Sequence, residues 1–121
     1  MIRTKSVYAA KSGEDGYRVL VAHDWPAGVA RGKSAGLEWM KSLGPSENLR
    51  GWMSRNPRKV GSFQNKYLAE LGHNEKGVAR IQMLLTRYET VTIITVPIPA
   101  EEDWGVVDVL VKYLRAHCDL D

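Results

Sequence analysis

Several features that define large classes of protein are missing from this 121-residue chain. A single cysteine excludes an internal disulfide and is typical of a cytoplasmic protein. No apolar run approaches the roughly 20 residues that a membrane-spanning helix needs, so we expect no membrane partner. Residues 1–5 lead directly into a polar segment, without the apolar region of a secretion signal. The sequence therefore predicts a cytoplasmic location.

Motifs for metal binding and nucleophilic catalysis are also missing. The histidines and the cysteine show neither His-x-x-x-His nor Cys-x-x-Cys spacing, so we predict no metal site and no cofactor. No serine lies in a Gly-x-Ser-x-Gly turn. The segment from Gly28 to Ser34 is one residue too short for a phosphate-binding P-loop. Cys118 lies beside acidic residues near the expected end of a helix, which disfavours a reactive thiolate.

Charge is distributed unevenly along the chain, although the net charge is only +3. Residues 1–87 contain 15 lysines and arginines and 7 acidic residues, whereas residues 88–121 contain 2 and 7. The first part is therefore basic and the last part acidic. This pattern predicts either two oppositely charged faces or the steering of an anionic partner to the first part.

Apolar periodicity predicts strands and helices in an alternating order. Runs rich in β-branched residues predict strands over residues 2–7, 17–22 and 91–96. Capping residues and helical spacing predict about five helices, beginning at Ser34, Ser46, Pro57, Asn74 and about Glu102. This order favours a single α/β domain over residues 1–121, with a small, mostly parallel sheet of three or four strands covered by the helices.

The second and third predicted strands each end in a polar loop that contains proline. If these strands are parallel neighbours, their carboxyl ends share one edge of the sheet, where open α/β sheets bind ligands. We therefore predict a small-molecule site at this edge, with Trp25 and Trp104 as its apolar walls. The candidate acid/base groups or polar ligand contacts are His23, Asp24 and Glu102.

Each of these residues also has a purely structural interpretation. His23 and Asp24 could form a hydrogen-bonded pair at the surface. The carboxylates of residues 101–103 could offset the positive end of a helix dipole. Trp25 could fill the core at the Trp-Pro turn.

A basic stretch offers an alternative function, which is noncatalytic binding of nucleic acid. Arg55, Arg58 and Lys59 belong to a 17-residue segment, residues 50–66, that contains no acidic residue. Aromatic residues are interleaved with these cations, as in nucleic-acid-binding faces, but they also fall on the apolar stripes of the expected helices. A third interpretation is a homodimer in which an exposed tryptophan or Ile98 packs across a two-fold axis.

The chain also carries a series of phrases that occur together in one protein family. Residues 14–21 read Glu-Asp-Gly-Tyr-Arg-Val-Leu-Val, and Trp-Pro-x-Gly follows at residues 25–28. Leu-Arg-x-Trp and Phe-x-x-x-Tyr-x-x-Glu-Leu come later, at residues 49–52 and 63–71. On these phrases the chain resembles the YeaO-like proteins, a family defined as domain of unknown function 488, over nearly its whole length.

The chain departs from the family pattern at polar positions. Residues 22–24 are Ala-His-Asp where the family has Asp-Arg-Leu, and residue 27 is an alanine where the family has an arginine. Residues 104–105 are Trp-Gly where the family has His-Asn. Arg50 does match a family position, so we include it among the candidate ligand-binding residues. The resemblance implies a divergent member with altered site chemistry, and it leaves both an enzyme and a noncatalytic binding protein open.

Overall fold

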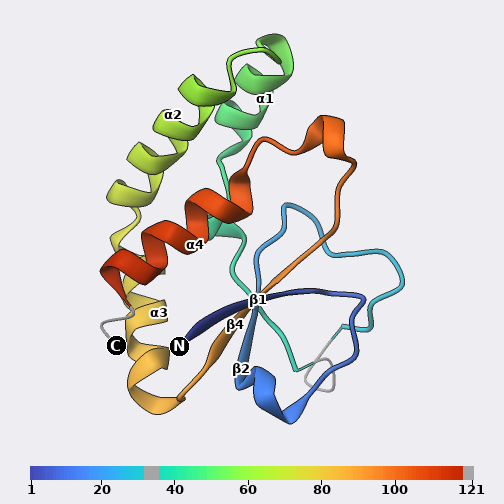
Figure 1. Ribbon diagram of the computed structural model, residues 1–121, viewed down its shortest axis with the longest axis vertical. Helices are drawn as coiled ribbons and strands as arrows, with labels where there is room; N and C mark the ends of the chain where they lie inside the picture. The colour runs from blue at the N-terminus through green and yellow to red at the C-terminus, as the bar shows by residue number, and fades with distance from the viewer. Residues whose placement is uncertain (32–35, 119–121) are drawn as a thin grey trace.

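Four short strands form a sheet at the centre of the molecule (Figure 1). The computed structural model describes residues 1–31 and 36–118. The strands are, in chain order, β1 (Ile2–Ser6), β2 (Tyr17–Leu20), β3 (Glu38–Trp39) and β4 (Val91–Thr95). They lie in the order β1-β4-β2-β3, and all of their pairings are parallel. The predicted α/β class and the small parallel sheet are therefore confirmed.

Four α-helices accompany the sheet: α1 (Glu47–Arg55), α2 (Val60–His73), α3 (Glu75–Arg87) and α4 (Val106–His117). Two of the predicted caps are present. The Ser46 Oγ accepts a hydrogen bond from the Leu49 N–H at 3.1 Å, and the Asn74 Oδ1 accepts one from the Gly77 N–H at 3.0 Å. These bonds satisfy backbone donors in the first turns of α1 and α3, which explains where both helices begin.

The helix predicted to begin at Ser34 is not formed. Ser34 lies outside the described residues, and the segment after it forms β3 and a 3₁₀ turn over Lys41–Leu43. The pairing of Trp39 with Leu20 in the sheet explains the difference, because it uses backbone groups that a helix would need internally. The bond from the Met40 N–H to the Leu20 oxygen, at 2.8 Å, extends this pairing.

Two other helices begin later than predicted. Pro57 lies in a turn, and α2 starts only at Val60. Glu102 belongs to a separate 3₁₀ turn over Ala100–Glu102, and α4 starts at Val106. The left-handed conformation of Gly105, with a φ of +79°, separates that turn from α4. Among the described residues, no helix has the combination of length and apolar character that crossing a bilayer requires.

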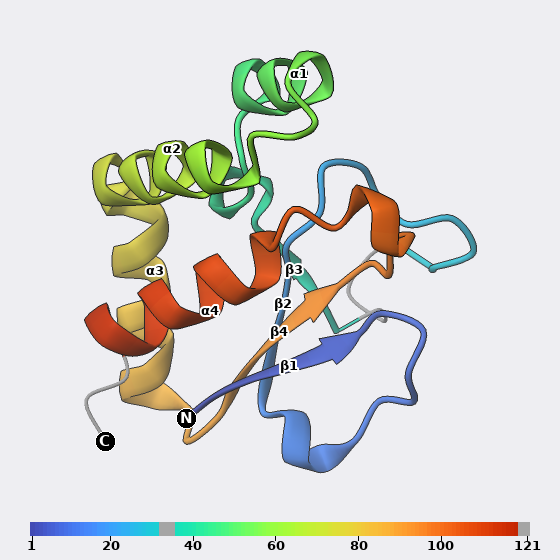
Figure 2. The ribbon, with the colours of Figure 1, turned by 45° about the horizontal axis from the view of Figure 1, so that its top comes forward.

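The alternation of side chains along the strands produces a hydrophobic cluster on each face of the sheet. Val19 and Ile93 point to one face and pack with residues of the helices. Their neighbours Leu20 and Ile94 point to the other face and pack with loop residues, including Trp25. Figure 2 shows this arrangement, with the helices on one side of the sheet and irregular loops on the other. The loop that carries Trp25 therefore covers one face of the sheet and also lies at the sheet's carboxyl edge.

Candidate functional site at the carboxyl edge of the sheet

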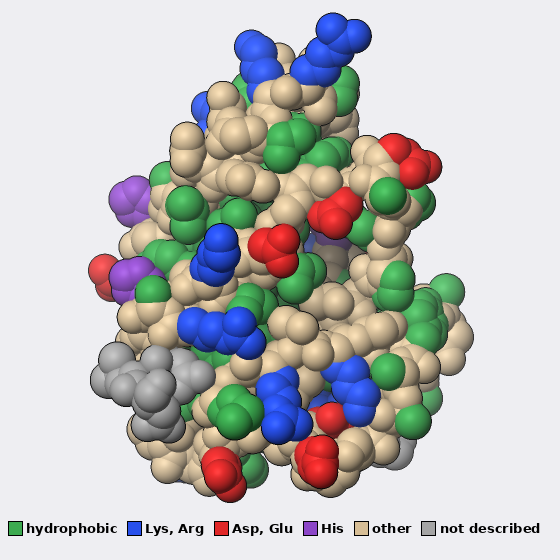
Figure 3. All heavy atoms as spheres, viewed as in Figure 1, with side chains coloured by type: hydrophobic (Ala, Val, Ile, Leu, Met, Phe, Trp, Pro, Cys, Tyr) green, Lys and Arg blue, Asp and Glu red, His purple; other side chains and the backbone are tan. Residues whose placement is uncertain are grey.

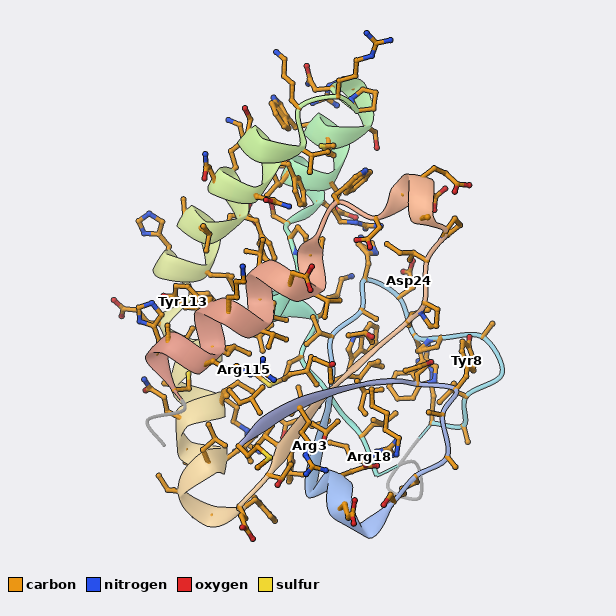
Figure 4. The ribbon with its side chains drawn as sticks, in the orientation of Figure 1. Arg3, Tyr8, Arg18, Asp24, Tyr113 and Arg115 are labelled. Atoms are coloured by element: carbon orange, nitrogen blue, oxygen red, sulfur yellow. The ribbon has the colours of Figure 1, made fainter. Side chains whose placement is uncertain are left out.

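A cavity of about 920 Å³ lies at the carboxyl ends of β2 and β4. These strands are parallel neighbours, with Leu20 opposite Ile94, so the residues that follow them leave the sheet side by side. Val21 and Thr95 line the cavity from the sheet, and residues of α1, α2 and α4 line it from the helical side. Figure 4 shows Asp24 on the loop that follows β2, close to the segment that leads from β4 to α4.

His23 lies between two carboxylates at this edge. Its Nδ1 is 3.4 Å from Oδ1 of Asp24, and its Nε2 is 3.5 Å from Oε1 of Glu47. Both ring nitrogens are buried, and neither makes a hydrogen bond with any residue in the described ranges. The side chains of Asp24 and Glu47 are 87% and 82% exposed, whereas that of His23 is 24% exposed. The imidazole therefore connects the loop after β2 with the first turn of α1.

Arg50 lines the cavity from the next turn of α1 and is half-buried. Its guanidinium makes no hydrogen bond or ion pair with any residue that the structure describes. The nearby carboxylate of Glu70 is already engaged, because it accepts hydrogen bonds from the backbone N–H of Ser46, at 2.9 Å, and from the Ser46 hydroxyl. This contact fixes the start of α1 against α2 and leaves Arg50 beside the open space.

The two tryptophans are fixed in the cavity wall by different contacts. The indole N–H of Trp25 donates to the Val29 oxygen at 2.8 Å, and its ring packs edge-on against Trp39, with centroids 5.7 Å apart. The ring of Trp104 packs edge-on against Phe63 at 5.4 Å. Trp104 is held further by its backbone oxygen, which accepts a hydrogen bond from Nε2 of Gln64 at 3.1 Å.

Six of the predicted site residues thus line one cavity: His23, Asp24, Trp25, Arg50, Glu102 and Trp104. Glu102 is exposed on its 3₁₀ turn, so it contributes to the rim. The predicted nucleic-acid residues lie elsewhere, at the turn between α1 and α2: Arg55, Arg58 and Lys59. All three are exposed at the end of the molecule where Lys and Arg side chains project in Figure 3.

The lining residues that were missed in the sequence include Glu47, Glu70 and Thr95. Thr95 could have been found, because it lies next to the end of the strand predicted over residues 91–96 and is the last residue of β4. Glu47 and Glu70 reach the cavity through the packing of α1 on α2, which has no local sequence signal. Within the described ranges, no three His, Cys, Asp or Glu side chains come together as a metal ion would require.

Comparison with known proteins assigns the chain to a family. A family model described as the inactive DUF488-N3 subclade matches residues 1–119. The chain belongs to the DUF488 family. The uncharacterised protein YeaO of Escherichia coli K12 is 36% identical over 80 residues, which cover 66% of this chain and 70% of YeaO. An uncharacterised protein of Mycobacterium tuberculosis H37Rv is 33% identical over 86 residues, 71% of this chain and 72% of the relative. No solved structure matches the chain.

In this DUF488 protein, the Glu-Asp-Gly-Tyr-Arg phrase holds β2 in place. An oxygen of Asp15 accepts a hydrogen bond from the Ser12 N–H at 3.0 Å, and Lys5 Nζ donates to the other at 3.0 Å. The backbone bond from Ser12, helped by Lys5, holds the pKa of the Asp15 carboxyl below its ordinary value. Gly16 has a φ of +62°, and a Cβ at this position would lie only 2.1 Å from the Thr90 oxygen. The phrase therefore has a structural role at the start of β2, whereas the cavity lies at the carboxyl end of that strand.

Proposed function

We propose that this DUF488 protein binds a small organic molecule in the cavity at the carboxyl edge of the sheet, without converting it. The observation that carries the proposal is the position of the cavity, which lies where two adjacent parallel strands end. Its volume of about 920 Å³ is within the usual range for ligand sites, roughly 300–1,000 Å³. Its lining combines an apolar surface with a few polar groups, as ligand sites do.

Two observations support binding without catalysis. The description of the matching family model names an inactive subclade. Two of the chain's nucleophiles, Ser46 and Cys118, are also engaged or lie elsewhere. The Ser46 hydroxyl caps α1 and contacts Glu70. Cys118 is buried at the end of α4, whereas the cavity lies at the start of that helix.

The proposal is tested by native mass spectrometry of the protein purified from its own host. We expect a small molecule in complex with the wild type, and its loss when the cavity is filled by Val107→Phe. Val109→Phe is the matched control, because Val109 is also half-buried on α4 but does not belong to the described cavity lining. A clean mass for the wild type, or retention of the molecule in Val107→Phe, would contradict the proposal.

The same sample distinguishes a noncatalytic binding protein from an enzyme, which is the alternative that the sequence left open. If the bound molecule is converted on incubation, and His23→Ala or Glu102→Gln abolishes the conversion, the protein is an enzyme. The mass also reports whether the chain forms the homodimer that was the third interpretation of the sequence. Ile98, which is 51% exposed at the cavity rim, is the residue to change if it does.

Nucleic-acid binding is a second candidate, supported by the exposed cations Arg55, Arg58 and Lys59. Two of the interleaved aromatic residues add no stacking platform, because Phe63 and Tyr67 are fully buried. The third, Trp52, is half-buried, and its ring is already covered by Nζ of Lys66, 4.9 Å from the ring centroid. Binding would therefore depend on phosphate contacts and fall steeply with salt. Fluorescence polarisation with random duplex DNA tests this, and equal weak binding by the triple alanine variant and the wild type would exclude it.

A further inference from the structure

We infer that the ligand of the cavity is a small monocarboxylic acid with an apolar body, and that Arg50 receives its carboxylate. This inference rests on the proposed function, because it names the chemical class that the same cavity takes. It is carried by the guanidinium of Arg50, which is half-buried in the wall and makes no hydrogen bond or ion pair with any described residue, whereas Lys41, another cation of the lining, is exposed to solvent.

A half-buried guanidinium is a strong reason to expect an anion. Removing Arg50 from bulk water costs free energy, and the described residues return none of it through an ion pair. A guanidinium presents a planar fork of N–H donors that matches the two oxygens of a carboxylate. The ligand that best completes this wall therefore places a carboxylate against Arg50.

The acidic residues of the cavity limit how much negative charge the ligand can carry. Both oxygens of Glu70 already accept hydrogen bonds from Ser46. Asp24 and Glu47 flank His23 and are more than four-fifths exposed, at 87% and 82%, so water and salt screen them. These carboxylates would still repel a phosphate or a polyphosphate more strongly than a single carboxylate. The balance favours one negative charge held close to Arg50.

The rest of the lining fits an apolar or aromatic body. Val106 and Val107 at the start of α4, together with Val96 after β4, give the cavity an aliphatic wall. The half-buried rings of Trp25 and Trp104 add aromatic surface. Aromatic side chains of this kind pack well against a flat ligand. A small aromatic acid satisfies both the guanidinium and these walls.

The inference is tested with matched acid and amide pairs, which share one body and differ only in charge. We would measure phenylacetate against phenylacetamide, and indole-3-acetate against indole-3-acetamide, by saturation-transfer NMR and isothermal titration calorimetry. The acids are expected to bind about 10-fold or more tightly than the amides, because a charge-assisted pair with Arg is lost in the amide.

Three variants assign the effect to Arg50. Arg50→Gln should weaken acid binding by about 10- to 100-fold and leave amide binding unchanged. Arg50→Lys should recover part of the loss, because lysine keeps the charge without the planar fork. Arg55→Gln is the matched control, since Arg55 is on the same helix but outside the described cavity lining, and it should bind as the wild type does.

The outcomes separate this inference from the proposed function. Equal binding of acids and amides, or acid binding that survives Arg50→Gln, would overturn the inference and leave the cavity as a ligand site. If none of the acid and amide pairs binds, the identity of the molecule found by native mass spectrometry tests the inference. A carboxylic acid lost in Arg50→Gln supports the inference, and a molecule without a carboxylate overturns it. No binding of any pair and no bound molecule would overturn both.

Discussion

The contact of Glu38 with Tyr17 and Arg80 should make the fold measurably sensitive to a single charge. Arg80 donates to Glu38 from Nε at 2.9 Å and from Nη2 at 2.5 Å, and the Tyr17 hydroxyl donates to the same carboxylate at 2.6 Å. These three bonds connect β3 to β2 and to α3. Since β3 has only two residues, they hold a strand that has few ladder bonds of its own.

The expected cost of Glu38→Gln follows from this geometry. The side chains of Glu38 and Arg80 are 27% and 37% exposed, so their pair lies between a surface salt bridge and a buried one. Surface pairs contribute up to about 1 kcal/mol, and breaking a buried pair costs about 3–5 kcal/mol. We expect Glu38→Gln to lower the free energy of unfolding by about 1–2 kcal/mol at pH 7. Urea denaturation followed by circular dichroism measures this change.

The dependence on pH checks the cause. The hydrogen bonds from Arg80 hold the pKa of the Glu38 carboxyl below its ordinary value, and the hydrogen bond from Tyr17 lowers it further to a smaller extent. A lowered pKa in the folded state stabilises the protein above the unfolded pKa, and this stabilisation is lost as the pH falls through the folded pKa. The difference between wild type and Glu38→Gln should therefore shrink on acidification.

Glu89→Gln is the control for this experiment, because Glu89 is an exposed acid whose side chain makes no hydrogen bond or ion pair with other described residues. It should leave the unfolding free energy unchanged at both pH values. A Glu38→Gln difference that is absent at pH 7, or that grows on acidification, would refute the reasoning that the carboxylate acts as a charged acceptor for Arg80.

Other positions give sharp expectations. Gly16→Ala should lower the free energy of unfolding by about 2 kcal/mol or more, because the new Cβ meets the Thr90 oxygen. Gly28→Ala should lower the free energy of unfolding by less, since Gly28 also has a positive φ but no atom lies within 4 Å of the added Cβ. Thermal unfolding of both variants measures the difference. Ser46→Ala should cost about 1 kcal/mol in urea denaturation through loss of the α1 cap. His23→Ala should weaken ligand binding in a tryptophan-fluorescence titration, and identical curves would remove His23 from the site.

The sequence predicted the parts of the fold that depend on local patterns. The strand over Val91–Thr95 and the helix capped by Asn74 were recognised because a β-branched run and a capping residue act within a few residues. The segment around Trp39 was not recognised as a strand. Its two residues are too few for an alternating pattern, and their state is decided by pairing with Val19 and Leu20. Tertiary contacts override local spacing in such short elements.

The position of the candidate site could also be predicted only in part. Residues that directly follow the strands, such as His23, could be placed at one edge as soon as two strands were taken as parallel neighbours. The contact between His23 and Glu47 could not be predicted, because it depends on how α1 packs against the loop. The helical wall of the cavity is therefore the part that only the structure supplies.

The departures from the family pattern are concentrated at the edge of the sheet. The phrase that contains Asp15 and Gly16 matches the pattern and holds β2 through buried contacts. Residues 22–24 and Trp104 depart from it and line the cavity, whereas Ala27 and Gly105 also depart from it but do not belong to the described lining. Loss of function without a new ligand gives no reason to keep Arg50 half-buried and without a partner among the described residues. We therefore infer a changed ligand, because the scaffold and Arg50 match the family pattern while the other polar and aromatic groups of the cavity wall differ from it.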